Sequence, residues 1–316
     1  MVGKLILTRI LYAVLTLLAV SVVVFAAVEI LPGDITTRIL GRSATPEAVA
    51  VLRKQLGYDQ PAVMRYANWL GGVLQGDLGT SLSSQRSVNE VIGPRLANTA
   101  ILALCAFVLS VPLSLLPAAA QALKPGSLLD TIASAINFVL LAIPDYLLAS
   151  IMLILFVVVI PVLPSTSLVT DASGFWDWVR ALILPSVVLA ISISIYAIRL
   201  LRDGLIDVLS RDYVRMAELK GMPLRVVLWR HAFPNAIGPT LNITALNISY
   251  LIGGVIIVER VFSFPGFGSV MVGALQAGDA PLIEATVLIA ALIYITANTL
   301  ADIGSILTNP KLRSAQ

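Results

Sequence analysis

The sequence predicts an all-α integral membrane protein with six transmembrane helices, on the strength of three observations. Hydrophobic residues make up 58% of the 316 residues and charged residues only 12%, against about 25% charged in an average soluble domain. The apolar residues lie in long blocks, and about 20 such residues are needed to cross the hydrocarbon core of a bilayer. Lysine and arginine gather in alternate connections between these blocks, as in a multi-pass membrane protein. We therefore do not expect a soluble fold.

The first apolar block covers residues 10–28 and contains no charged residue. A cleaved signal peptide is the alternative, because Val24, Phe25 and Ala26 resemble a small-residue cleavage site. The apolar stretch is longer than the core of a typical signal peptide, so we favour a retained transmembrane anchor.

Five further blocks complete the predicted set. Pro144 lies in the middle of the third block, where its ring removes a backbone hydrogen bond and bends a helix. Each block is long enough to satisfy its own backbone polar groups, as lipid requires. These spans cover residues 96–123, 131–160, 181–198, a stretch within 232–258, and 282–301.

Basic residues set the predicted orientation. With the N-terminus inside, twelve lysines and arginines fall in cytoplasmic segments, and the short outside loops hold only Arg180 and Arg260. The other seven lie in the long segment 32–95, which can be translocated largely regardless of its charge. Both termini are therefore predicted to be cytoplasmic.

The chain divides into four predicted parts. A small folded cap is favoured over a passive connector for the long outside segment. Its first helix would begin at Thr45 and Pro46 and stop at Gly57, and its second would begin at Pro61. The parts are 1–31 with the first span, the extracytoplasmic cap loop 32–95, the membrane core 96–310 with a cytoplasmic loop 199–235, and the tail 311–316.

Several kinds of chemistry are missing from the sequence. It contains no G-x-x-x-x-G-K-[ST] nucleotide-binding motif and no H-E-x-x-H. His231 and Cys105 are the single histidine and cysteine, so we expect no catalytic residue, metal site or cofactor in this chain. The excess of positive charge follows from topology, and we expect no nucleic-acid partner.

Acidic residues in the spans are also few. Asp145 lies in the third span, whereas Glu29, Glu284 and Asp302 are close enough to an interface to be solvated. A proton-coupled mechanism therefore has little support in the sequence. If the chain moves a solute uphill, we expect the energy to come from outside the chain.

The cytoplasmic loop contains a predicted helix of about nine residues. Asp212 suits the N-cap, Lys220 suits the last turn, and Gly221 suits the left-handed position that follows, while Pro223 can start another helix. So short a helix is marginal alone in water, which favours docking on a partner. An ordinary positive-inside loop with incidental helicity stays an equal alternative.

The predicted docking face combines three residues. Tyr213, Met216 and Ala217 share one side of the expected helix. Because Ala217 and Gly221 are small, a partner backbone could approach them closely.

The loop resembles the coupling loop of permease subunits of bacterial ABC importers, and more narrowly that of the first permease of the dipeptide, oligopeptide and nickel uptake family. The similarity covers nearly the whole chain. Glu218 and the Met222-Pro223 turn depart from the commoner pattern of this family, which affects the expected geometry of coupling. The residues that carry the resemblance are Leu31-Pro32-Gly33-Asp34, Leu56-Gly57-Tyr58-Asp59-Gln60-Pro61, Gly76-Asp77-Leu78-Gly79, Ile143-Pro144, Asp212-Tyr213-Val214-Arg215, Ala217 with Gly221, Arg230-His231-Ala232, Pro265-Gly266-Phe267-Gly268 and Asn309-Pro310-Lys311-Leu312-Arg313.

The resemblance implies one half of a transmembrane pore in a prokaryotic cytoplasmic membrane. Its partners would be a second, homologous permease, two cytoplasmic P-loop ATPase subunits that bind ATP and Mg, an extracytoplasmic solute-binding protein, and membrane lipid. The expected ATPase-coupling residues are Asp212, Tyr213, Arg215, Ala217, Glu218, Gly221, Pro223 and His231. The expected translocation-path residues are Asn242, Thr244, Asn247, Ser249 and Tyr250 of the fifth span, with Asp145. Hydrogen bonding between packed helices is an equal explanation for any one polar residue of the fifth span.

Two other classes of protein compete with this interpretation. An ion- or proton-coupled carrier should show broken helices at matching places in two repeats, and we find a single proline break, in the third span. A channel should show a filter-like segment, and we find none. Within the family, the substrate could be a dipeptide, an oligopeptide, a nickel chelate or another small solute.

Overall fold

The computed structural model describes residues 2–30, 45, 47, 54, 59–170, 173–236 and 253–308. Throughout these residues the regular secondary structure is helical, which confirms the predicted all-α class. Four of the described helices are long and apolar enough to cross a membrane, or five spans if one bent pair counts as a span. The predicted fifth span lies mostly in residues 237–252, outside the described residues, so the count of six stays a prediction.

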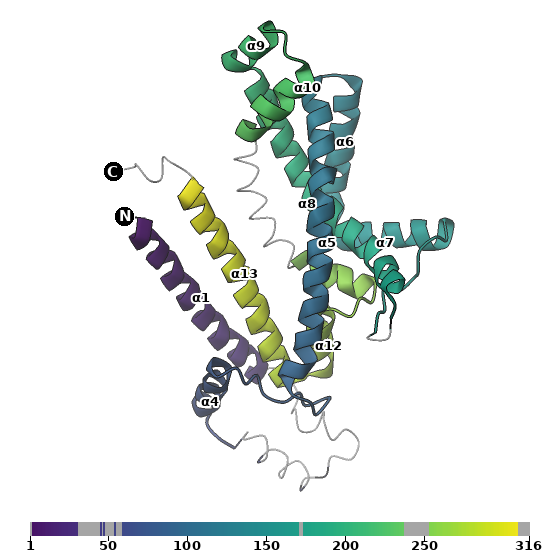
Figure 1. The fold of residues 1–316 in the computed structure, drawn as a ribbon. Coiled ribbons are helices and arrows are strands. Elements are labelled where there is room, and N and C mark those ends of the chain that lie inside the picture. Colours follow the sequence, from purple (N-terminus) through teal and green to yellow (C-terminus); the bar gives the residue numbers. More distant parts are fainter. Residues whose placement is uncertain are drawn as a thin grey trace. The chain divides into compact units, whose positions relative to one another are not determined.

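The chain forms two compact units, Met1–Thr99 with Pro265–Gln316, and Ala100–Phe264. In the first unit, α1 (Val2–Ile30) and α13 (Ala280–Thr308) lie side by side in opposite directions (Figure 1). Arg9 Nη1 lies 3.0 Å from Asp302 Oδ2, close to the start of α1 and the end of α13. The two ends therefore lie together.

Helix α4 (Ala62–Leu74) begins directly after Pro61, as predicted. It rests on α1 through a cluster of Phe25, Tyr66 and Trp69, with ring centroids 5.4 to 6.0 Å apart. The Tyr66 hydroxyl also shares a 2.8 Å hydrogen bond with Ser21, and Arg65 pairs with Glu29. The predicted helix that would begin at Thr45 lies largely outside the described residues.

Helix α12 (Phe267–Ala277) was not predicted from the sequence. It ends at Gly278, whose φ of 67° is left-handed, and Asp279 then precedes α13. The carboxylate of Asp279 accepts hydrogen bonds from the Ser81 and Ser83 hydroxyls at 2.6 and 2.7 Å and from the Leu82 and Ser83 amides at 3.1 and 3.0 Å. This carboxylate holds the outer loop against the start of α13.

The second unit contains most of α5 (Val88–Leu123), then α6 (Leu128–Ala142), α7 (Asp145–Leu153) and η2 (Ile154–Val159). The third predicted span is more than kinked at Pro144, because its two halves are bent by 107°. Proline disfavours a helical conformation in the residue before it, and Ile143 is extended with ψ 120°. The bend is therefore a full break between α6 and α7.

Helix α8 (Phe175–Leu209) is longer than the predicted span at both ends. The connection predicted from Arg199 onwards therefore begins as helix, because α8 continues to Leu209. Leu201, Leu205 and Val208 are buried at helical spacing in this extension, so their packing maintains the helix beyond the apolar block.

The prediction that Glu284 is solvated was also wrong, since this residue is 7% exposed on the inner face of α13. Glu29 and Asp302, by contrast, form ion pairs with arginines at the ends of their helices.

Candidate coupling site

The helix predicted in the cytoplasmic loop is α9 (Asp212–Leu219). The Arg211 carbonyl accepts the amides of Val214 and Arg215 at 3.0 and 3.1 Å. Arg211 therefore occupies the N-cap position, and Asp212 is the first helical residue rather than the predicted cap. Asp212 still lies where a negative charge favours the positive end of a helix.

The end of α9 matches its prediction. Gly221 has a φ of +77°, and the Met222 amide donates to the Ala217 carbonyl at 3.3 Å. This is the hydrogen bond of a Schellman motif, in which the left-handed residue is usually glycine. No atom lies within 4 Å of where a Gly221 Cβ would sit.

The two faces of α9 have different surroundings. Val214 and Ala217 are buried, whereas Tyr213, Met216 and Leu219 are 46%, 54% and 75% exposed. The expectation that Ala217 shares the docking face was therefore wrong, because Ala217 packs inside its own chain. Leu219 takes the place of Ala217 on the exposed face of α9, beside Tyr213 and Met216.

Helix α10 (Leu224–Val226) follows with Pro223 at its N-cap, and it continues into the π-helical turn η3 (Val227–Ala232). The Pro223 carbonyl accepts the amides of Val226 and Val227. His231 is half-buried, and its carbonyl accepts the Asn235 side chain at 2.7 Å.

A buried hydrophobic cluster joins this segment to the spanning helices. It brings together the ends of α5 and α8 with α9, η3 and Ala236. Gly204 on α8 allows the close approach, because a Cβ there would lie 3.3 Å from the Ala236 carbonyl oxygen. The buried members are Ala118, Ala119, Ala122, Leu201, Leu205, Val208, Val214, Ala217, Val227, Leu228, Ala232 and Ala236. Because this cluster is buried, we expect a displacement of α9 to move the ends of α5 and α8 with it.

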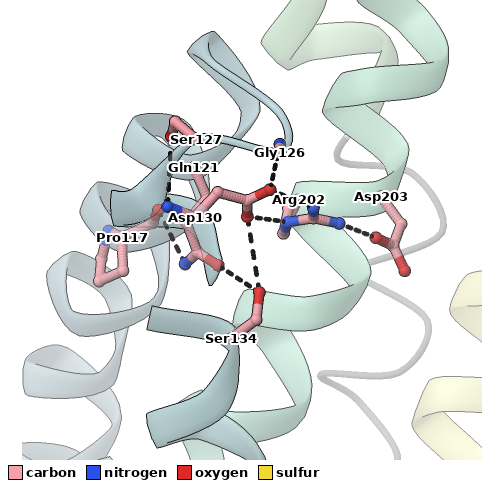
Figure 2. Close-up of polar contacts among 8 residues, drawn as sticks. All are labelled: Pro117, Gln121, Gly126, Ser127, Asp130, Ser134, Arg202 and Asp203. Carbon is pink, nitrogen blue, oxygen red and sulfur yellow. Dashed lines mark hydrogen bonds and ion pairs between the residues drawn. The ribbon is translucent and has the colours of Figure 1, made fainter. Parts of the chain in front are cut away.

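An ion pair ties α6 to the same end of α8 (Figure 2). Arg202 donates from Nε to Asp130 Oδ1 at 2.7 Å and from Nη2 to Oδ2 at 2.6 Å, so the pair is bidentate. The Asp130 side chain is only 4% exposed and that of Arg202 is 23% exposed. Such geometry is both strong and directional.

Further hydrogen bonds surround the pair and bring in α5 (Figure 2). The Gly126 amide donates to Asp130 Oδ2 at 2.8 Å, and Ser134 donates to Gln121 of α5 at 3.2 Å. Arg202 Nη1 also donates to Asp203 at 2.8 Å. The helix ends that carry α9 are thus connected by polar as well as apolar contacts.

Neither Asp130 nor Arg202 was predicted as a site residue, and Arg202 contributed only to the charge count that sets the orientation. Ser127 and Asp130 do have the spacing of a helix start, and Ser127 caps α6. Seventy-two positions separate the two charged residues, so a single sequence offers no signal that they meet.

The remaining predicted coupling residues can be placed. Tyr213 and Arg215 are exposed with Asp212 on α9, and the backbone of Glu218 is helical while its side chain lies outside the described set. For the translocation path, Asp145 is the first residue of α7 and accepts a 2.7 Å hydrogen bond from the Ser192 hydroxyl of α8. The other predicted path residues lie outside the described residues: Asn242, Thr244, Asn247, Ser249 and Tyr250.

Comparison with known proteins identifies the family of this chain. Residues 110–314 match the family described as the binding-protein-dependent transport system inner membrane component. Residues 1–103 match its N-terminal membrane component. The chain belongs to this family.

Relatives of this permease align with it over nearly its full length. A protein of Brucella melitensis biotype 1, named as a peptide transport system permease, is 34% identical over 99% of both chains. The glutathione transport system permease of Salmonella typhimurium is 33% identical over 98% of both chains. A peptide ABC transporter permease named in Sinorhizobium fredii is 29% identical over 98% of this chain and 99% of its own.

The chain is therefore the permease component of a binding-protein-dependent ABC transporter and an inner membrane component with several apolar helices. Such a system includes ATPase and substrate-binding partners. The resemblance stated from the sequence is confirmed at this level.

Proposed function

We propose that this permease is one half of the pore of an ATP-driven importer that carries di- or oligopeptides, or a related small solute such as a nickel chelate, across the cytoplasmic membrane. A second, homologous permease forms the other half, and two ATPase subunits bind ATP and Mg. The names of the peptide and glutathione relatives support the substrate class. The sequence supplies no nucleotide-binding motif of its own, which favours an external energy source and no cofactor in this chain.

The two-faced helix α9 carries this proposal. Val214 and Ala217 on its inner face are buried against the rest of the chain, and Tyr213, Met216 and Leu219 on its outer face are exposed. Apolar side chains gathered on an exposed surface mark a site of protein contact. The family implies ATPase partners, and such a subunit is the occupant that we propose for this face.

Motion of the ATPase subunits would reach the pore through contacts already described. Closure of the ATPase dimer displaces α9, the buried cluster carries the displacement to α5 and α8, and the Asp130–Arg202 pair includes α6. The break at Pro144 lies at the other end of α6. Alternating access of a path along these helices is the expected result.

The rest of the topology follows the sequence prediction. With six spans, both termini lie in the cytoplasm. The Arg9–Asp302 ion pair supports this topology, because it brings the start of α1 and the end of α13 to the same side of the membrane. The extracytoplasmic segment 32–95 then faces the solute-binding protein. The fifth span, with Asn242, Thr244, Asn247, Ser249 and Tyr250, lines the path together with Asp145.

Substitution of Leu219 by Asp tests the docking of α9. Leu219 is exposed, so a charge there leaves the core of the permease intact and disrupts an apolar contact with the ATPase. We expect Leu219→Asp to insert normally but to lose copurification of the ATPase subunits and ATP-driven uptake. Leu74→Asp, at a similarly exposed leucine of α4 in the outer segment, is the matched control for insertion and should keep copurification of the ATPase subunits.

Substitution of Gly221 by Arg should give the same loss, because a side chain both strains the left-handed backbone and occupies the open space beside α9. Retention of full, coupled ATPase activity by Leu219→Asp would contradict the proposed docking surface.

A further inference from the structure

Two neighbouring cavities lie along one face of α8 within the second unit. The larger has a volume of about 500 Å³ and lies between α6 and α8, and the smaller, of about 180 Å³, lies at the break between α6 and α7. They share the lining residues Leu141, Ile195 and Tyr196. The two cavities therefore adjoin and form one elongated site.

Asp145 stands in the smaller cavity. Its Oδ1 accepts the Ser192 hydroxyl, and its Oδ2 lies 3.1 Å from where a Gly254 Cβ would be. Within the described part of the chain, no lysine or arginine forms an ion pair with this carboxylate. A carboxylate inside a spanning segment is costly unless it meets a cation, a donor or water.

Arg199 lines the larger cavity. Its guanidinium lies 5.3 Å from the centre of the Phe138 ring, and it forms no ion pair with a described carboxylate. The neighbouring Arg202 is different, because Asp130 and Asp203 already neutralise it. Arg199 is therefore available to an anion that enters the cavity.

The spacing of these opposite charges matches a short peptide. Ser192, which binds Asp145, and Arg199 are seven residues apart on α8 and share one face, which gives about 10 Å along the helix axis. The arginine side chain leans back toward the helix N-terminus, which shortens this span. An extended chain covers about 3.3 to 3.6 Å per residue, so two or three residues bridge the gap.

We infer that this elongated site binds a short zwitterionic peptide end to end. Its ammonium group binds Asp145 and its carboxylate binds Arg199, while its middle packs on Ile195 and Tyr196. The inference rests on the proposed function and narrows its substrate class to peptides of two or three residues with both termini free. It assigns selectivity for free termini to the permease, in addition to any selection by the solute-binding protein.

Protection of a cysteine in the cavity tests this inference without the solute-binding protein. Leu141→Cys, in a Cys105→Ser background, places a thiol where the two cavities adjoin. The permease complex in nanodiscs is treated with a small thiol reagent in the presence of trialanine, its N-acetyl derivative or its C-terminal amide. We expect trialanine to slow labelling at concentrations about tenfold or more below those of either blocked peptide, because each blocked end loses a charge-assisted contact.

Two variants test which residue binds each end of the peptide. In Asp145→Asn, trialanine and its N-acetyl derivative should protect equally, and in Arg199→Gln, trialanine and its amide should protect equally. Each comparison is a ratio within one variant, so it does not depend on how much protein folds. Arg180→Gln, an exposed arginine at the other end of α8, should keep the wild-type ratios.

Other outcomes would overturn the inference. It fails if trialanine gives no protection, if the ratios are the same in all variants, or if phosphatidylglycerol in the nanodisc blocks labelling and the peptide has no effect. ATP-driven uptake of peptides by the complete transporter is measured in parallel. If the complete transporter takes up peptides but the protection ratios are not as expected, only the inference about the cavity is overturned. If the complete transporter takes up no peptide, the proposed substrate is overturned as well.

Discussion

At the scale of single residues, the Asp130–Arg202 pair is the contact with the largest expected effect on stability. Loss of the Asp130 charge removes the charge-assisted hydrogen bonds to Arg202, which is 23% exposed and keeps Asp203 as a partner, and such bonds contribute about 1.5–3 kcal/mol. Asp130→Asn should therefore lower the free energy of unfolding by about this amount. Denaturant or thermal unfolding of the permease in nanodiscs measures the effect.

A surface ion pair provides the control for this prediction. Asp207 and Arg211 are 64% and 58% exposed and form a pair one turn apart. Such pairs contribute little, so Asp207→Asn should unfold like the wild type. Equal stability of Asp130→Asn and the wild type would show that the buried pair does not hold α6 to α8.

Single residues also differ in how well the sequence predicts them. Gly221 was placed correctly because a left-handed helix end is a local property of a few neighbouring residues. The Asp130–Arg202 pair was missed because it depends on the packing of two helices that are distant in sequence. Ala217 was assigned to the wrong face because the helical spacing was known, but the direction of the core was not.

At the scale of elements, the outer loop at residues 81–84 depends on one carboxylate. Burial opposes ionisation of Asp279, but hydrogen bonds from Ser81, Ser83 and Leu82 outweigh it and place the pKa of Asp279 below its usual value. The folded pKa thus lies below the unfolded value of about 3.9. The stabilisation of the docked loop is present above the unfolded pKa and is lost as pH falls through the folded pKa.

Hydrogen exchange of the loop amides measures this dependence. The Leu82, Ser83 and Ser84 amides donate to Asp279 or to Ser81. After correction for the intrinsic effect of pH, they should be protected at pH 7 and lose protection below about pH 4. Asp279→Asn should expose these amides already at pH 7, whereas Asp77→Asn, at an exposed aspartate of the preceding turn, should not. Protection that is independent of both pH and Asp279 would contradict the assignment.

The break at Pro144 shows what sequence reasoning can and cannot give at this scale. Proline predicted an interruption at the right position, because the missing amide and the steric clash are local. The angle of 107° was not predicted, because the direction in which α7 leaves α6 depends on what it packs against. Buried Leu148 and Ala149 of α7 belong to the same hydrophobic cluster as Leu184, Val188 and Leu189 of α8.

At the scale of the whole molecule, the proposed orientation can be tested with two single cysteines. In a Cys105→Ser background, Leu74→Cys should react with a membrane-impermeant maleimide in intact cells, and Leu219→Cys only in inverted vesicles from cells that lack the ATPase subunits. Both positions are highly exposed. Ser83 would be a poor choice for this test, because its hydroxyl binds Asp279. Labelling of Leu74→Cys only from the cytoplasmic side would reverse the topology.

The sequence by itself determined the membrane class, the position of five described apolar segments, the proline break, the short helix of the coupling site and the family. These follow from length, apolar blocks, charge distribution and local capping, all of which can be read along the chain. The tertiary structure alone decided the buried face of α9, the extension of α8, the Asp130–Arg202 pair and the two adjoining cavities that Asp145 and Arg199 line. Each of these depends on which helices lie together, and packing between distant segments has no local signal in a single sequence.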